Sequence, residues 1–276
     1  MNAATPDHAM EENMSENCAR LFSLDGRHAL VTGAGGGIGT ALATGLARHG
    51  ADVACIDLTE DIAQRGVGAV RALGRRGLAI ACDVREPAAI ESTVDAVLER
   101  FGSLEILVNL AGKGILKPTL NLTLEDWEDT VNTYLRGTFL FSKAVGKRMC
   151  DRGRGSIVNI SSVASMVALG RGTGAYAAVK AGVNALTREL ALEWAKRGVR
   201  VNAIAPCQIE TPQLYSVLND PQFDQEKLMN TWLDAIPLGR LGRPEELVGP
   251  CVFLASDASS LVTGHVLMAD GGYTIK

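Results

Sequence analysis

Short apolar runs rich in β-branched residues alternate with longer segments of helical periodicity along almost the whole chain. Such runs, each ending in glycine or a polar residue, are typical of buried strands. Strands that alternate with helices predict an α/β fold, a doubly wound parallel sheet with helices on both faces. The expected strands are 28–32, 51–56, 77–81, 104–108, 156–160, 199–205 and 264–268. Four expected helices span 61–73, 87–101, 123–149 and 244–254, and Thr123 is the expected N-cap of the third. Two further helices are expected to end near 49 and near 195.

The carboxyl ends of these strands carry the residues that could bind a ligand. In an open parallel sheet, ligands bind beyond those ends. Polar or glycine residues follow six of the expected strands, which core packing alone does not explain: 33–39, Asp57, Asp83, 109–112, Ser162 and 206–207. Residues 21–276 contain no linker-like stretch, so we expect one domain there, preceded by a flexible polar tail at 1–20.

Composition excludes several classes of protein. The 276 residues have a formal net charge of −4, which gives no indication of nucleic-acid binding. No apolar run reaches the ~18 residues of a membrane span, and residues 1–20 lack the apolar core of a signal peptide. The six cysteines show no CxxC spacing, so we expect reduced thiols, a cytoplasmic location and no metal site.

Tyr176 and Lys180 lie one helical turn apart and therefore share a helix face. A phenol has a pKa of about 10, and a nearby ammonium should favour the phenolate and lower that pKa. Ser162, brought alongside, could hydrogen-bond a substrate oxygen. This trio suits proton transfer at an alcohol or ketone oxygen. Taken alone, the spacing also fits a half-buried tyrosine beside a solvated lysine.

A glycine-rich turn separates the first expected strand from its helix. Residues 32–39 do not fit the G-x-G-x-x-G fingerprint but do fit Thr-Gly-x-x-x-Gly-x-Gly. Glycines let the backbone approach a pyrophosphate, and the helix N-terminus supplies amide donors. A flexible turn with no ligand is the alternative. Asp57 at the end of the next strand favours the dinucleotide, because a carboxylate there can accept both ribose hydroxyls of adenosine.

Together these motifs resemble the short-chain dehydrogenase/reductase family over about residues 21–273. The matching stretches are 32–39, Asp83-Val84, 109–112, Ser162 with Tyr176 and Lys180, 201–206 and 270–272. The resemblance implies a single-domain Rossmann fold with a seven-stranded sheet, a nicotinamide cofactor and a homotetramer. It implies an oxidoreductase that moves a hydride between NAD(H) and a secondary alcohol or ketone.

The resemblance also implies residue roles. Tyr176 would be the general acid/base, Lys180 would bind the nicotinamide ribose and tune the phenol, and Ser162 would hold the substrate oxygen. The expected cofactor contacts are Gly33, Gly36, Gly37, Ile38, Asp57, Leu58, Asn109, Ala111, Gly112, Tyr176 and Lys180, with Asp83 and Val84 at the adenine and Ile209 and Thr211 at the carboxamide.

Three positions depart from the family pattern. Leu110 replaces the second asparagine of Asn-Asn-Ala-Gly, and Cys207 replaces the glycine after Pro206. The family's catalytic asparagine in the long helix falls on Tyr134 by counting. Asn132 lies two residues away, roughly 200° around a regular helix, so it is not expected to act in a proton relay.

Asp57 predicts a preference for NAD over NADP. Two unit charges ~4 Å apart repel by about 4 kcal/mol at an effective dielectric of ~20, so a carboxylate should disfavour the extra phosphate. The positions where a compensating cation would be expected are Gly36 and Leu58, both uncharged. Arg65 is the nearest later cation, and we interpret it as a solvated helix residue.

The substrate is weakly encoded. Its pocket should be lined by 113–117, 162–174 and 208–234, and residues 212–236 are expected to form a mobile, largely irregular cap with helical pieces. Within the family, the stretches 211–213, 223–225 and 247–250 look most like gluconate-type sugar-acid dehydrogenases, which favours a sugar acid or polyol. A carboxylate could bind Lys113, Lys117 or Arg171, unless these are solvated loop charges.

Two alternatives remain open from the sequence. A 3-oxoacyl reductase would share the fold and chemistry but would more often use NADP. A catalytically silent dinucleotide sensor would keep the fold only to bind partners, and such a protein could lose Tyr176 or Lys180, yet both are present.

Overall fold

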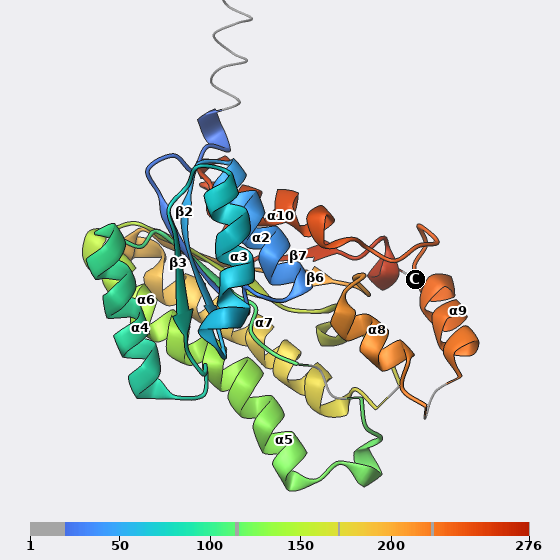
Figure 1. The fold of residues 1–276 in the computed structure, drawn as a ribbon. Coiled ribbons are helices and arrows are strands. Elements are labelled where there is room, and N and C mark those ends of the chain that lie inside the picture. The colour runs from blue at the N-terminus through green and yellow to red at the C-terminus, as the bar shows by residue number, and fades with distance from the viewer. Residues whose placement is uncertain (1–19, 114–115, 171, 222–223, 276) are drawn as a thin grey trace, which may run out of the picture.

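Seven parallel strands form one continuous sheet in the computed structural model of this chain, with the order β3-β2-β1-β4-β5-β6-β7. The structure describes residues 20–113, 116–170, 172–221 and 224–275, so the expected tail at 1–20 lies almost wholly outside the described residues. Figure 1 shows the sheet between helical layers. The strands are β1 (His28–Thr32), β2 (Asp52–Asp57), β3 (Gly77–Ala81), β4 (Ile106–Asn109), β5 (Gly155–Ile160), β6 (Val199–Pro206) and β7 (Val266–Ala269).

Helices connect the strands, and most occupy the expected positions. The long ones are α2 (Gly37–Arg48), α3 (Glu60–Ala72), α4 (Pro87–Phe101), α6 (Gly137–Arg152) and α7 (Gly174–Trp194). The shorter ones are α5 (Leu124–Thr130), α8 (Pro212–Leu218), α9 (Gln225–Ala235) and α10 (Val248–Ala255). In the described part of the chain, no helix is long and apolar enough to cross a membrane.

The two faces of the sheet are covered by different helices. Because side chains alternate along a strand, Val31 packs with α2, α3 and α10 while its neighbour Leu30 packs with α4, α6 and α7. Figure 1 shows α2 beside α3 in front of the strands and α4 with α6 on the other side. The five inner strands are therefore buried on both faces, which explains their continuous apolar sequences, while the edge strands β3 and β7 are partly exposed. The doubly wound α/β architecture expected from the sequence is confirmed.

Three segments differ from expectation. The helix expected at 123–149 is interrupted by a π-helical turn (Val131–Arg136), although Thr123 does cap its start in a capping box with Asp126. The segment 212–234 is more regular than expected, because α8 and α9 pack on a small core of their own. The helix expected at 244–254 begins with a 3-10 turn (Pro244–Leu247). We call residues 212–236 the cap; whether it moves stays a prediction.

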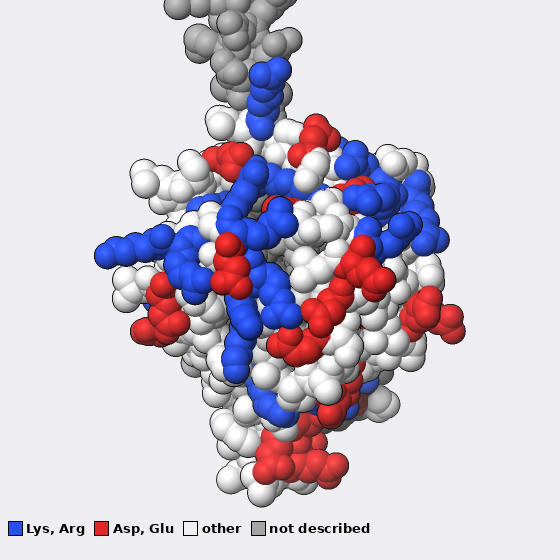
Figure 2. Space-filling view, turned by 90° about the vertical axis from the view of Figure 1, so that its left-hand side faces the viewer, with Lys and Arg blue, Asp and Glu red and all other residues white. Residues whose placement is uncertain are grey.

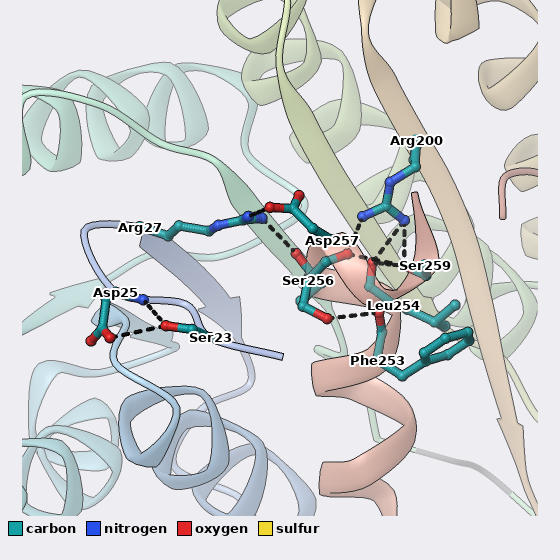
Figure 3. Close-up of polar contacts among 10 residues, drawn as sticks. Ser23, Asp25, Arg27, Arg200, Phe253, Leu254, Ser256, Asp257 and Ser259 are labelled. Carbon is teal, nitrogen blue, oxygen red and sulfur yellow. Dashed lines mark hydrogen bonds and ion pairs between the residues drawn. The ribbon is translucent and has the colours of Figure 1, made fainter. Parts of the chain in front are cut away.

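The amino ends of the strands are held by paired charges. Arg27, just before β1, donates to the Ala255 carbonyl and pairs with Asp257, while Arg200 in β6 donates to the Leu254 carbonyl (Figure 3). The last carbonyls of a helix have no partner within the helix, so these guanidinium groups satisfy the end of α10. The contacts tie α10 to two strands that lie far from it in sequence.

Basic side chains gather on the side of the molecule seen in Figure 2, with acidic side chains among them. Three helices carry an arginine in their last turn: Arg71 in α3, Arg100 in α4 and Arg152 in α6. Cations are favourable at the negative end of a helix dipole. Helix C-termini are therefore one source of the basic side chains of this molecule.

Candidate active site

Ser162, Tyr176 and Lys180 meet beyond the carboxyl end of β5. Ser162 follows the strand directly, and α7 brings Tyr176 and Lys180 across from the neighbouring layer. The Tyr176 hydroxyl forms a hydrogen bond with the Ser162 side chain. The ammonium nitrogen of Lys180 is buried and donates to the Ile160 carbonyl at 2.5 Å. The alternative in which Lys180 is solvated beside a half-buried tyrosine is therefore wrong, since Lys180 is only 4% exposed.

The pKa values of the pair shift toward neutral side chains. Burial lowers the pKa of Lys180 to about 7. Burial also raises the pKa of Tyr176, and the hydrogen bond with Ser162 only partly opposes this. For the residues of the chain alone, the net shift of the Tyr176 pKa is upward, and the expected effect of Lys180 on the phenol stays a prediction. The physical reason for the shifts of both residues is desolvation, which disfavours both charged forms.

Tyr134, at the position of the family's asparagine, lies in the same cluster. Its ring meets the Tyr176 ring edge-on, with centroids 5.3 Å apart and planes at 80°. The ammonium nitrogen of Lys180 lies 4.6 Å from the Tyr134 ring centroid, closer than its 5.6 Å from the Tyr176 ring. Asn132 does not line the pocket beside Tyr176. The π-helical turn thus directs a second phenol, rather than an amide, toward the catalytic trio.

The glycine turn has the form of a phosphate cradle. A Cβ on Gly35 would lie 2.2 Å from the Ile62 carbonyl oxygen and one on Gly39 would lie 2.0 Å from that of Gly33, so both must be glycine. Gly36 caps α2, and a Cβ added there would meet no atom closer than 3.5 Å, so its face of the turn is open. The amide groups that begin α2 and this open backbone fit a dinucleotide pyrophosphate.

A groove of about 440 Å³ continues from the glycine turn past the end of β2. Asp57 stands in it, with its carboxylate accepting from the Gly35 and Leu58 amides at 3.0 and 2.9 Å. Arg65 is exposed but lines the same groove, so its interpretation as a merely solvated residue is incomplete. The remaining expected contacts in this groove are Gly33, Gly36, Leu58, Asp83, Val84, Ala111 and Gly112, and Lys113 also lines it.

Asp83 is held by an arginine that the sequence analysis did not single out. Arg85 donates to both carboxylate oxygens of Asp83 and also to Asp129. These hydrogen bonds hold the pKa of Asp83 below its ordinary value, although burial opposes them. The clamp fixes the wall of the groove at the position expected to contact the adenine.

The Asn109 side chain is buried and makes its hydrogen bonds in the core, while its expected cofactor contact stays a prediction. Its side-chain amide donates to Ser142 and to the Asn159 side chain, so it braces β4 against β5 in the core. Thr32, which had no expected role beyond the glycine motif, accepts hydrogen bonds from the Leu110 and Ala111 amides and so holds the turn after β4. The cofactor would meet this turn through its backbone.

Cys207 replaces a glycine without strain. No non-glycine residue in the described ranges has a positive φ, so the backbone here does not need the freedom of glycine. Burial raises the pKa of the Cys207 thiol to about 11, which keeps it protonated. The departure from Pro-Gly therefore changes the wall of the pocket rather than the path of the chain.

A second pocket of about 240 Å³ lies beside Tyr176 and is bounded by the cap. Its walls are mostly apolar, with two side-chain amides from Gln208 and Gln213. Ile38, Ile209 and Thr211 lie where this pocket meets the cofactor side. The apolar side chains are Leu116, Leu169, Leu214, Val217 and Trp232.

Of the cations considered for carboxylate binding, Lys113 and Lys117 do not line this pocket. Lys117 is held in an ion pair with Asp126, and Lys113 lies along the dinucleotide groove. Arg171 lies outside the described residues. Among the described residues, Lys180 is the cation that lines the pocket, and its ammonium already donates to the Ile160 carbonyl.

Comparison with known proteins identifies the family. A family model described as "Enoyl-(Acyl carrier protein) reductase" matches residues 33–274. D-threitol dehydrogenase from Mycolicibacterium smegmatis is 44% identical over 257 residues, which cover 92% of this chain and 95% of that protein. Gluconate 5-dehydrogenase from Gluconobacter oxydans is 39% identical over 93% of this chain and 98% of that protein.

A solved structure agrees with the sequence matches. The gluconate 5-dehydrogenase from Burkholderia cenocepacia, in complex with NADP and tartrate, superposes with a TM-score of 0.86 at 36% identity, over 94% of this chain and 99% of that one. The chain therefore belongs to the short-chain dehydrogenase/reductase family. It is a nicotinamide-dependent oxidoreductase that transfers a hydride at the CH–OH group of a secondary alcohol, or in reverse at a ketone.

Proposed function

We propose that this enzyme oxidises an uncharged polyol with NAD as its preferred cofactor. One observation carries the substrate class. The side-chain oxygen of Gln208 is buried at the pocket and has no hydrogen-bond partner among the described residues. An orphan acceptor suits a ligand that donates, such as an alcohol hydroxyl, and disfavours a carboxylate, which only accepts.

The environment of Lys117 supports the same choice. Its ion pair with Asp126 gives its charge a partner outside the pocket. Among the described walls a carboxylate would therefore meet Lys180 as its cation, and that ammonium already donates to the Ile160 carbonyl, so burial of the carboxylate would cost desolvation energy. D-threitol dehydrogenase from M. smegmatis is a relative whose name denotes an uncharged polyol. The resemblance to gluconate-type enzymes makes a sugar acid the competing substrate.

Tyr176 is proposed as the general acid/base of the reaction. In the oxidative direction its phenolate takes the hydroxyl proton from the substrate, and in reduction the phenol returns it. Ser162 donates a hydrogen bond to the same substrate oxygen, and Lys180 supplies the positive charge that favours the phenolate. The bound nicotinamide supplies the hydride acceptor or donor. The apolar pocket walls exclude water from these groups.

The preference for NAD rests on Asp57. Its carboxylate is oriented by two backbone amides and stands in the groove where the adenosine ribose is expected. A phosphate on that ribose would meet this negative charge, with Arg65 as the counteracting cation. Related structures contain NADP, including that from B. cenocepacia. The choice between the two cofactors therefore depends on the balance between Asp57 and Arg65.

A homotetramer and a cytoplasmic location complete the proposal. Exposed apolar side chains on three segments, Phe139 in α6, Leu192 in α7 and Leu261 before β7, would be covered by subunit contacts. The described cysteines are all free, which suits a reducing compartment. Light scattering at micromolar concentration tests the assembly, and a monomer would contradict it.

The decisive experiment is a panel of polyols, sugar acids, cyclic ketones and 3-oxoacyl esters, each assayed with NAD and NADP. We expect the highest kcat/KM for a polyol with NAD. The highest kcat/KM for a 3-oxoacyl ester with NADP would contradict both the substrate and the cofactor. Cofactor binding without turnover of any alcohol would indicate a silent sensor instead.

A further inference from the structure

Tyr134 separates the dinucleotide groove from the substrate pocket and lines both. It is only 6% exposed and belongs to the π-helical turn between α5 and α6. π-helical turns are rare, and they occur often at functional sites because the extra residue redirects a side chain. At this position the family pattern has asparagine, so the chain has placed an aromatic ring where a small amide is usual.

Backbone and side chains hold the Tyr134 ring firmly. On one side it packs so closely on Gly112 that a Cβ there would lie 2.0 Å from the ring. Lys180 lies over the ring, with its ammonium nitrogen 4.6 Å from the centroid, and the Tyr176 ring meets it edge-on. A cation within about 6 Å of an aromatic face is attracted to it, more strongly when desolvated. An asparagine could not supply that face.

The hydroxyl of Tyr134 reaches a different element. It forms a hydrogen bond with the side chain of Gln213, which belongs to α8 in the cap. One side chain therefore contacts the catalytic lysine through its ring and the cap through its hydroxyl. Of the catalytic trio, Tyr176 and Lys180 contact this ring.

We propose that Tyr134 is a positioning residue, whose ring holds the Lys180 ammonium beside Tyr176 and whose hydroxyl ties this pair to the cap through Gln213. The inference rests on the proposed function, because it assigns a role within the same reaction. The groups that face Lys180 are Tyr176 on α7 itself, Tyr134 on the π-helical turn and the Ile160 carbonyl on β5. Burial is the cause of the shifted lysine pKa, so the ring is the compensating contact that a substitution can remove.

The ring is tested by comparing Tyr134→Phe with Tyr134→Leu. The phenylalanine keeps the aromatic face, so the pH profile of kcat should match the wild type. The leucine removes the aromatic face, which disfavours the charged form of Lys180. Because that charge favours the Tyr176 phenolate, the phenolate is disfavoured as well. We expect kcat at pH 7 to fall about 2- to 30-fold and the rising limb of the oxidation profile to move up by about 0.5–1 pH unit. An unmoved limb in a folded Tyr134→Leu protein would overturn this role.

The hydroxyl is tested by a double-mutant cycle of Tyr134→Phe and Gln213→Leu. If Gln213 acts through Tyr134, each single change should raise KM by a similar factor with little change in kcat, and the double change should add almost nothing. Independent, additive effects would overturn the link to the cap. This cycle keeps the proposal testable even if Tyr134→Leu does not fold.

Phe141→Leu is the matched control, because Phe141 is a fully buried ring in α6 outside the active site. It should lower the melting temperature without moving the pH limb. NADH binding followed by fluorescence checks that each variant still takes up cofactor. If Tyr176→Phe loses activity but no Tyr134 variant shows an effect, only the positioning role of Tyr134 is overturned. Full activity of Tyr176→Phe would instead refute the proposed function.

Discussion

The amino and carboxyl ends of the parallel strands differ in how their polar and charged side chains are paired. At the amino end, Asp52 sits between Arg75 and Arg76, and Arg27 pairs with Asp257. Burial works to raise the pKa of Asp52, but hydrogen bonds and charge from the arginines outweigh it and hold that pKa below its ordinary value. These charged groups pair with one another within the chain, so they stabilise the fold.

The carboxyl end keeps polar groups that are not matched within the chain. The Gln208 oxygen has no partner among the described residues, and burial shifts the pKa values of Tyr176 and Lys180 toward neutral forms. Such groups cost stability unless a ligand satisfies them. The difference indicates where the function lies: charged groups at the amino ends pair within the chain, whereas the carboxyl ends carry the groups that we propose bind cofactor and substrate.

The largest expected effect comes from Tyr176→Phe at the carboxyl end. It removes the proposed proton-transfer group but keeps the ring, so kcat should fall by about 10²–10⁴ while the melting temperature stays close to the wild type. Steady-state rates and thermal unfolding measure the two effects. Retention of most of the wild-type kcat would remove Tyr176 from the mechanism.

The double change Asp57→Ser/Leu58→Arg should invert cofactor preference. It removes the carboxylate and adds a cation at the end of β2, so the ratio of kcat/KM for NAD to that for NADP should fall more than about tenfold. Arg65→Ala in the wild-type background should move the ratio the other way, since Arg65 lines the same groove. A wild-type enzyme that uses NADP equally well would refute the assignment of Asp57.

Arg27→Met removes a charge pair at the amino ends of the strands instead. The change leaves the Ala255 carbonyl and the Asp257 carboxylate without their partner, so the free energy of unfolding should drop by about 1–3 kcal/mol. Because Arg27 lies at the opposite end from Tyr176, kcat should not change. Denaturant unfolding and initial rates test this together, and a fall in kcat at full saturation would show that the two ends are not separate.

Lys180→Met should change the pH dependence of stability. The pKa of Lys180 is lowered from 10.5 to about 7, so between these values the unfolded chain binds a proton that the folded chain does not. Stability of the wild type should therefore rise with pH above about 7, by about 1 kcal/mol between pH 7 and 8, relative to the methionine variant. Identical pH slopes for the two proteins would show that Lys180 is not buried in its neutral form.

The fold was largely predictable because strand periodicity is local. All seven strands lie within two residues of their expected bounds. The π-helical turn was not predictable, since 131–136 contain neither proline nor glycine to mark a break. Tyr134 in this turn packs closely on Gly112, a contact that the sequence of 131–136 does not reveal.

Side-chain direction limited the prediction of the site. Ser162, Tyr176 and Lys180 were expected together, and they lie together. Asn109 has the expected place at a strand end, yet its amide turns inward because Ser142 and Asn159 offer it partners. Motif spacing gives the position of a residue along the backbone but not which neighbour will satisfy its polar atoms.

The most direct test of the account is the ratio of kcat/KM for a four- to six-carbon polyol to that for the sugar acid of the same length, measured with NAD. The proposed pocket offers the Gln208 oxygen to a hydroxyl, and Lys117 is held by Asp126. We predict that the polyol is preferred by about tenfold or more, because the described walls offer a carboxylate no cation except Lys180, which is already bound to the Ile160 carbonyl. A ratio in favour of the sugar acid would contradict the account.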